Sequence, residues 1–171
     1  MRLPLLAVLI LSSACSKAPS YEPYSDAGAG FSFEAPKGWP RDADPSPTGK
    51  PVVTTEFIGD AEPQDEGLAL GAVLTVTRLS RKAGEKILAP TKALFPDDAP
   101  TAAESKPYSR DYEHGGPTPL HQDAAAIPMR VEGRVFRTRD AFFVVELRGV
   151  RAKFDKNRHA LERALASFRP S

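Results

Sequence analysis

Cysteine is almost absent from this sequence of 171 residues, which contains it once, at Cys15. A single cysteine excludes an intramolecular disulfide, so the fold must be stabilised by burying apolar surface, for which 41% hydrophobic residues suffice. Long apolar runs are absent as well. The apolar stretch Leu3–Leu11 falls well short of the ~20 residues that a membrane-spanning helix needs. A transmembrane helix is therefore not predicted.

Signatures of catalysis and of cofactor binding are also missing. The sequence has no Gly-x-Ser-x-Gly, His-Glu-x-x-His, phosphate-loop or cysteine-nucleophile motif. Gly28-Ala29-Gly30 is not a dinucleotide fingerprint, because Phe33 stands where the third glycine belongs. The acidic stretch Asp60–Gly67 lacks the glycine that a calcium loop needs at its sixth position, where Asp65 stands. We therefore predict a protein that is not an enzyme and has no cofactor, and we interpret residues 60–67 as a solvated hairpin loop.

The apolar stretch at the start is typical of an export signal. Arg2 precedes it, and the small residues Ser12-Ser13-Ala14 follow it. The segment resembles the lipobox of bacterial lipoproteins, with Ser12 in place of the usual leucine. That resemblance implies that Cys15 becomes the lipid-modified first residue, and that Ser16 after it directs the protein to the outer membrane of a Gram-negative bacterium. Ordinary cleavage at the same point, leaving a free thiol, is the alternative.

Proline is abundant, with 17 residues or about twice the usual share, and it marks the connections. We predict a signal peptide at residues 1–14, a lipidated cysteine and flexible tether at 15–30, and one domain at 31–171. Further proline-rich connections are expected at 36–51 and 96–119.

Charge is balanced overall but unevenly placed. Residues 1–129 hold 12 Lys and Arg against 17 Asp and Glu, whereas residues 130–171 hold 11 against 5. A basic C-terminal part suits anionic headgroups or an acidic partner, and an ordinary solvated surface is the other interpretation. We do not expect a nucleic-acid partner for an exported protein.

Alternation of apolar and polar residues predicts strands, and a spacing of three and four predicts helices. The expected strands are 31–35, 52–58, 68–79, 127–137 and 141–150, the last two forming a hairpin. A helix capped by Asp155 is expected to run to Pro170, with His159 on its solvated side, and a second helix is expected within 84–95. This order favours an antiparallel β-sheet with helices packed on its faces, an α+β fold.

The stretch Gly30-Phe-Ser-Phe-Glu-Ala-Pro-Lys-Gly-Trp39 and the ending Ala164-Leu-Ala-Ser-Phe168 resemble the PsbP-like group. This group includes a photosystem II subunit, the eukaryotic nuclear-transport factor Mog and many bacterial lipoproteins. The similarity covers Phe31 to Arg169. It implies an α/β/α sandwich in which Trp39 and the Ser167-Phe168 ending anchor the core, and members that mostly act by binding a protein. The stretch 96–119 is less typical and leaves the strand count there open.

A polar stretch in the second half contains possible metal ligands. Asp111, Glu113, His114, His121 and Asp123 combine carboxylates with imidazoles, which are ligands for zinc or manganese. Their spacing matches no compact metal motif, and a polar loop is the competing interpretation. Two functions remain: a lipid-anchored envelope module, without catalytic activity, that docks an unidentified protein partner, and an envelope protein that binds a small ligand or metal.

Overall fold

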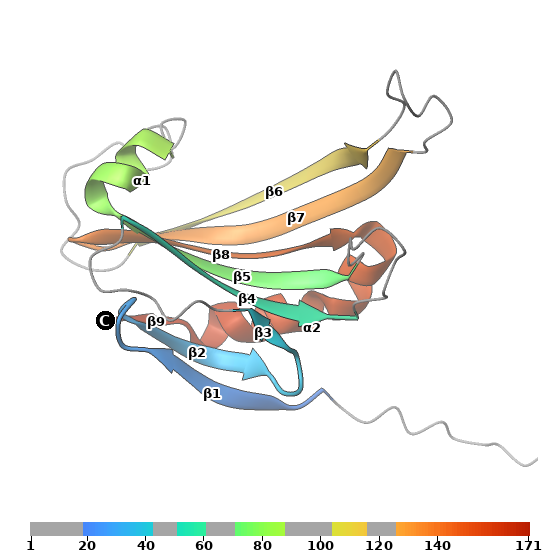
Figure 1. Ribbon diagram of the computed structural model, residues 1–171, viewed down its shortest axis with the longest axis horizontal. Helices are drawn as coiled ribbons and strands as arrows, with labels where there is room; N and C mark the ends of the chain where they lie inside the picture. Colours follow the sequence, from blue (N-terminus) through green and yellow to red (C-terminus); the bar gives the residue numbers. More distant parts are fainter. Residues whose placement is uncertain (1–18, 43–50, 61–70, 88–103, 116–125) are drawn as a thin grey trace, which may run out of the picture.

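The computed structural model describes residues 19–42, 51–60, 71–87, 104–115 and 126–171. Within them the chain forms a six-stranded sheet, a three-stranded sheet and two helices (Figure 1). The strands are β1 Tyr21–Asp26, β2 Phe31–Pro36, β3 Arg41–Asp42, β4 Val52–Gly59, β5 Ala72–Ser80, β6 Glu104–Gly115, β7 Ala126–Arg137, β8 Ala141–Val150 and β9 Arg169–Pro170. The helices are α1 Arg81–Ile87 and α2 Arg151–Ser167. None of the described helices is long and apolar enough to cross a membrane.

The large sheet has the strand order β3-β4-β5-β8-β7-β6, and each pair of neighbours is antiparallel. β7 and β8 form the predicted hairpin, in which the Ala141 amide donates to Thr138 Oγ1 at 3.1 Å. β5 pairs along its whole length with β8, far away in sequence. The small sheet has the order β1-β2-β9. The predicted strands 52–58, 127–137 and 141–150 are confirmed with nearly the expected bounds, and 68–79 is confirmed from Ala72 onward.

One face of the large sheet carries the main core. Alternate residues of β5 and β8 point to this face, and Leu74 and Leu147 there have no exposed surface. α2 and the small sheet lie over the same face (Figure 1). Phe31 of β2 and Phe168 after α2 both contact Phe143 of β8, at ring-centroid distances of 6.2 and 5.7 Å. The aromatic rings therefore join all three elements into one core.

The opposite face of the large sheet carries a smaller cluster and α1. Leu79, Val135 and Phe142 form this cluster. α1 packs close to it, because a Cβ at Gly84 would lie 2.2 Å from the Phe142 ring. The predicted antiparallel sheet with packed helices is thus confirmed. The described part of the chain is richer in strands than the α/β/α sandwich that the resemblance implies, and that finer arrangement is not confirmed.

The two motifs of the predicted resemblance lie in the core. Gly38 has a φ of +82°, which turns the chain after β2 and places Trp39 against Gly59. A Cβ at Gly59 would come within 2.2 Å of the Trp39 ring, so only glycine fits there. Phe168 is 3% exposed and packs on Phe136 at a centroid distance of 4.6 Å. The Trp39 and Phe168 side chains therefore pack the segments that follow β2 and α2 against the large sheet.

The predicted tether contains a strand. β1 lies within residues 15–30 and pairs with β2 over its whole length, Tyr21 opposite Pro36 and Asp26 opposite Phe31. The prediction of a flexible tether up to residue 30 is wrong for this segment, because Tyr24 packs its ring against the core at Phe33 and Phe57. The folded domain begins no later than Tyr21 rather than at Phe31.

Two further predictions are wrong in part. β6 occupies residues 104–115, inside the stretch expected to be a proline-rich connection, and forms the edge of the large sheet. α2 begins at Arg151, directly after β8, without a side-chain cap, so Asp155 is not its first-turn cap. Phe154 explains the earlier start, because it has no exposed surface and extends the apolar stripe of the helix by two turns. The helix predicted at 84–95 is α1, which starts earlier, and residues 88–95 lie outside the described part.

Part of the uneven charge of the sequence is matched by ion pairs within the fold. Within the described residues, ion pairs connect the acidic part of the chain with the basic last 42 residues. They join Asp111 to Arg130, Glu56 to Arg148, Asp60 to Lys156, and Glu34 to Arg163. In these pairs the positive charge of the C-terminal part is opposed by a carboxylate from the earlier part of the chain.

Candidate functional site

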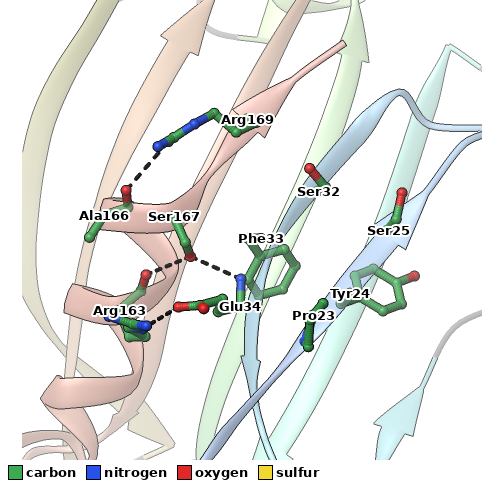
Figure 2. A pocket seen from close by; sticks show the side chains of 10 residues that line it. All are labelled: Pro23, Tyr24, Ser25, Ser32, Phe33, Glu34, Arg163, Ala166, Ser167 and Arg169. Carbon is green, nitrogen blue, oxygen red and sulfur yellow. Dashed lines mark hydrogen bonds and ion pairs between the residues drawn. The ribbon is translucent and has the colours of Figure 1, made fainter.

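An open hollow of about 480 Å³ lies between the small sheet and the C-terminal half of α2 (Figure 2). We call it the β2–α2 groove. Its walls come from β1, β2, α2 and β9. The residues that line it are Pro23, Tyr24, Ser25, Ser32, Phe33, Glu34, Arg163, Ala166, Ser167 and Arg169. The groove thus combines small hydroxyl side chains with two arginines and one carboxylate.

Ser167 joins the two walls of the β2–α2 groove. The Glu34 amide donates to Ser167 Oγ at 2.9 Å, and the Ser167 hydroxyl donates to the Arg163 carbonyl at 2.7 Å (Figure 2). The hydroxyl therefore satisfies an amide at the edge of β2 and a carbonyl of the helix at once. The Arg163 guanidinium forms an ion pair with the Glu34 carboxylate and lies over the Tyr21 ring, 5.7 Å from its centroid. These contacts fix the groove before any ligand arrives.

The end of the groove near β9 has a row of polar side chains. Ser25 lies opposite Ser32, and Ser32 lies opposite Arg169, so the three share the outer face of the small sheet. The Arg169 guanidinium donates to the Phe168 carbonyl at 2.7 Å and to the Ala166 carbonyl at 3.3 Å, which orients it along the groove. Hydroxyls and a guanidinium in one row are suited to acceptor groups of a partner.

A second hollow, of about 400 Å³, borders the other side of α2. This β6–α2 groove is lined by Pro107, Tyr108, Ser109, Glu132, Gly133, Arg134, Arg158, Leu161, Glu162 and Leu165. It exists because α2 packs on β8, β5 and β7, whereas the edge strand β6 extends beyond the helix. Two leucines of α2 give this groove an apolar wall opposite the polar side chains of β6 and β7.

Glu132 connects the floor of the β6–α2 groove to its wall. Its carboxylate accepts from Arg130 Nε at 2.8 Å and pairs with Arg158 of α2 at 3.3 Å. The Glu132 side chain is 12% exposed. Its hydrogen bond raises the pKa of the Arg130 guanidinium. The Glu132 carboxylate thereby links β7 to α2 across the β6–α2 groove.

A tyrosine and a glutamate meet across a glycine on the face that carries α1. Tyr108 of β6 lies opposite Gly133 of β7, and Gly133 lies opposite Glu146 of β8. Because Gly133 has no side chain, the Tyr108 hydroxyl reaches across β7 and donates to the Glu146 carboxylate. Burial, and then the charge of Glu146, raises the pKa of Tyr108 above its usual value. This contact ties the edge strand β6 to the centre of the sheet.

The described residues do not bring the predicted metal ligands together. Asp111 and His114 lie three residues apart on β6, so their side chains point to opposite faces of the sheet. Asp111 lies 3.7 Å from Arg130, whose positive charge opposes a cation there. His121 and Asp123 lie outside the described residues, as does the predicted lipidation site Cys15. Among the described residues, no group of three histidine, cysteine or acidic side chains is placed to hold a metal ion.

His159 is not on a freely solvated surface, contrary to the prediction. It is half-buried, and its Nδ1 lies 2.9 Å from the Tyr21 hydroxyl. The two rings meet edge to face with centroids 6.3 Å apart. Burial raises the pKa of Tyr21, which keeps this hydroxyl protonated. The contact fastens the beginning of β1 to the middle of α2.

Sequence patterns did not reveal either groove, because each joins segments far apart in the chain. Glu34 and Arg163 are separated by more than 120 residues, and no spacing within one element relates them. The one available signal was the Ser167-Phe168 ending, for which the resemblance implies a role in the core. Ser167 has a second role, since it links the groove walls.

No protein-family model and no curated protein sequence matches this chain. Similar solved structures include the Ran-binding protein Mog1p of Saccharomyces cerevisiae, with 12% identity, a TM-score of 0.45, and coverage of 90% of this chain and 96% of that one. They also include the cyanobacterial PsbP of Synechocystis sp. PCC 6803, with 13% identity, a TM-score of 0.35, and coverage of 95% and 99%. These are the two kinds of protein that the predicted resemblance names. At TM-scores below 0.5 the likeness identifies no activity, partner or location.

Proposed function

We propose that this chain is a lipid-anchored binding module of the bacterial cell envelope that docks a protein partner and catalyses no reaction. The observation that carries the proposal is the β2–α2 groove, whose two walls are held together by Ser167 and by the ion pair between Glu34 and Arg163. A preformed surface avoids part of the ordering cost of association, because its side chains are already held in place. An open surface that combines apolar and polar side chains is better suited to docking a protein than to enclosing a small substrate.

The β2–α2 groove carries both a cation, Arg163, and an anion, Glu34, so it is suited to a partner that offers both hydrogen-bond acceptors and donors. Arg163 is 51% exposed and Glu34 is 35% exposed, so each side chain has surface left for a further contact. Ser25, Ser32 and Arg169 extend this polar surface toward β9. Charged groups at the rim of an interface mainly set specificity and the rate of association. The groove is therefore suited to recognising one partner rather than to binding any basic or acidic surface.

The proposed cellular location rests on the sequence alone. The apolar stretch Leu3–Leu11, the small residues before Cys15 and the cysteine itself support export and lipidation, with the outer membrane of a Gram-negative bacterium as the destination. Multiple acyl chains on Cys15 would hold the protein stably, since each buried methylene contributes ~0.8 kcal/mol. The anchor then keeps the groove within the envelope, where its partner is found.

The test compares two exposed alanines of the same helix. Ala166 lies in the β2–α2 groove, whereas Ala152 lies in the first turn of α2 and lines neither groove. A photo-reactive phenylalanine analogue is placed at each position in cells, in the full lipidated chain. We expect a covalent adduct of one defined mass from position 166 and none from position 152. Equal patterns from both positions, or no adduct from 166, would contradict docking in this groove.

One observation favours the alternative of a small-ligand carrier. The volume of the β2–α2 groove, about 480 Å³, lies within the ~300–1,000 Å³ typical of ligand pockets. Native mass spectrometry of protein purified from its own envelope decides between the two functions. A bound small molecule that is lost in Ala166→Arg but retained in Ala152→Arg would favour the carrier.

A further inference from the structure

The start of β1 sets how far the domain can stand from its lipid anchor. Six residue steps separate Cys15 from Tyr21, and even a fully extended chain of that length spans only about 20 Å. A flexible chain of six residues has a root-mean-square length of about 13 Å. A tether reaching residue 30 would instead extend to about 50 Å. The strand in the predicted tether therefore brings the domain close to the bilayer.

β1 begins, with Tyr21, at one end of the strands, which we call the proximal end (Figure 1). The Lys37 amide donates to the Ser20 carbonyl at 2.9 Å, so the turn after β2 lies beside the start of β1. Asp60, which follows β4, accepts from the Asn157 side chain at 2.9 Å. α2 begins at the same end of the sheet, where Arg151 follows β8 directly.

The opposite or distal end lies one strand length away. The turn between β7 and β8, which contains Arg139, is separated from Arg151 by the ten residues of β8. Ten residues of strand span about 33 Å. α1 and the turn between β1 and β2 also lie at this distal end (Figure 1). If the proximal end faces the bilayer, the distal end lies about 33 Å farther out, which is more than the ~20 Å that the extended six-residue linker can span.

We infer that the domain sits end-on, with its proximal end against the phospholipid headgroups. The inference rests on the proposed lipid anchor at Cys15. Lys37 and Arg151 are exposed cations at this end, and the first turn of α2 contains no acidic residue. A linker whose root-mean-square length is about 13 Å lets the proximal end approach the bilayer to within the screening length of ~8 Å at physiological salt, where these cations attract anionic headgroups. The distal end, including α1, faces away from this membrane.

Two exposed arginines provide a matched test. Arg151→Cys and Arg139→Cys place a thiol at the proximal and distal ends, and acylation of Cys15 leaves the introduced cysteine as the only thiol. Each full lipidated chain is labelled with a fluorophore and inserted into vesicles of phosphatidylcholine and phosphatidylglycerol that contain a headgroup-attached acceptor. We expect energy transfer from position 151 to exceed that from position 139 at least about twofold, because ~33 Å separates the labels. Lys37→Cys, a second proximal site, is expected to behave like position 151.

The outcomes separate the orientation from the anchor. Equal transfer from positions 139 and 151 in vesicle-bound protein, or more from 139, overturns the end-on arrangement and leaves the lipid anchor standing. If the parent chain is found in the soluble fraction rather than with the vesicles, as is expected for Cys15→Ser, the lipid anchor is overturned and with it the end-on arrangement. A preference for position 151 that is equal in vesicles with and without phosphatidylglycerol retains the arrangement and overturns the contact of Lys37 and Arg151 with anionic headgroups.

Discussion

Gly133 is the position where one methyl group should be most disruptive. A Cβ there would lie 2.5 Å from the Val145 carbonyl oxygen and 2.8 Å from Glu146 Cβ. The first distance is 0.9 Å short of the 3.4 Å at which ordinary contact begins. Because the atom in the way belongs to the backbone of the central strand β8, β7 must shift, and overpacking of this kind costs ~1–3 kcal/mol. A loss of about 2 kcal/mol in a chain of this size lowers Tm by about 4–8 °C.

The same methyl group should also interrupt the contact between Tyr108 and Glu146. Tyr108→Phe alone removes a hydrogen bond to a charged group, which contributes about 1.5 kcal/mol. A double-mutant cycle measures this coupling. It compares the thermal unfolding, followed by circular dichroism, of the parent chain, Gly133→Ala, Tyr108→Phe and the double variant. We expect Tyr108→Phe to cost about 1 kcal/mol less when Gly133→Ala is present, because the contact is already lost. A Tm for Gly133→Ala within 1 °C of the parent chain, or additive losses, would refute this reasoning.

Two further predictions concern stability. Hydrogen bonds from Lys156 and Asn157 lower the pKa of Asp60 below its ordinary 3.8, so its stabilising effect is present above that value and is lost as pH falls through the lower, folded pKa. Asp60→Asn, which also suits the backbone φ of 48°, should therefore lower Tm at pH 6. The difference in Tm from the parent chain should shrink as the pH falls below 3.8 and through the lower, folded pKa, and a difference that stays constant with pH would contradict this. Phe168→Ala should lower the free energy of unfolding by ~3–5 kcal/mol, because it leaves a cavity where the ring packs on Phe31 and Phe143. Phe168→Leu should lower it distinctly less. Urea unfolding measures both, and similar losses in the two variants would show that packing of the ring is unimportant.

The parts of the fold that could be predicted from the sequence are those whose two faces differ strongly. β8 is predicted with its observed bounds because Phe143, Val145 and Leu147 alternate with residues that are partly exposed from Val144 onward. The hairpin with β7 followed from the polar turn between the strands. In such segments the burial pattern and the local sequence carry the same information.

β6 and β1 were missed because neither strand shows that alternation. β6 is the edge of the large sheet, and its described side chains are mostly polar or charged, with Pro107 in the middle. Charges and proline are typical of edge strands, which need not bury a face and must not pair with other chains. β1 contains Pro23 and has a single ring, Tyr24, that packs on the core. A sequence pattern cannot distinguish such a strand from a polar connection.

The candidate site was less predictable than the fold. Chemistry-bearing residues close in sequence, Asp111 and His114, point to opposite faces of one strand. The side chains that build the grooves come together only through packing, as with Arg158 of α2 and Glu132 of β7. The helix start was misjudged for a similar reason, since Phe154 is buried by the sheet and not by its own neighbours. Local spacing carries no record of these long-range contacts.

The pairing of the first and last segments bears on when this chain can fold. β2 pairs with β9, the Ser171 amide donates to the Gly30 carbonyl at 2.9 Å, and β5 finds its inner neighbour only in β8. A nascent chain that ends before residue 141 lacks the strand at the centre of its large sheet, and one that ends before residue 151 lacks the helix that covers it. Such non-local topologies fold slowly, after the distant partners have been synthesised. A chain of this design therefore completes its fold only after its last residues have been synthesised, so the export proposed above would act on a chain that is still unfolded.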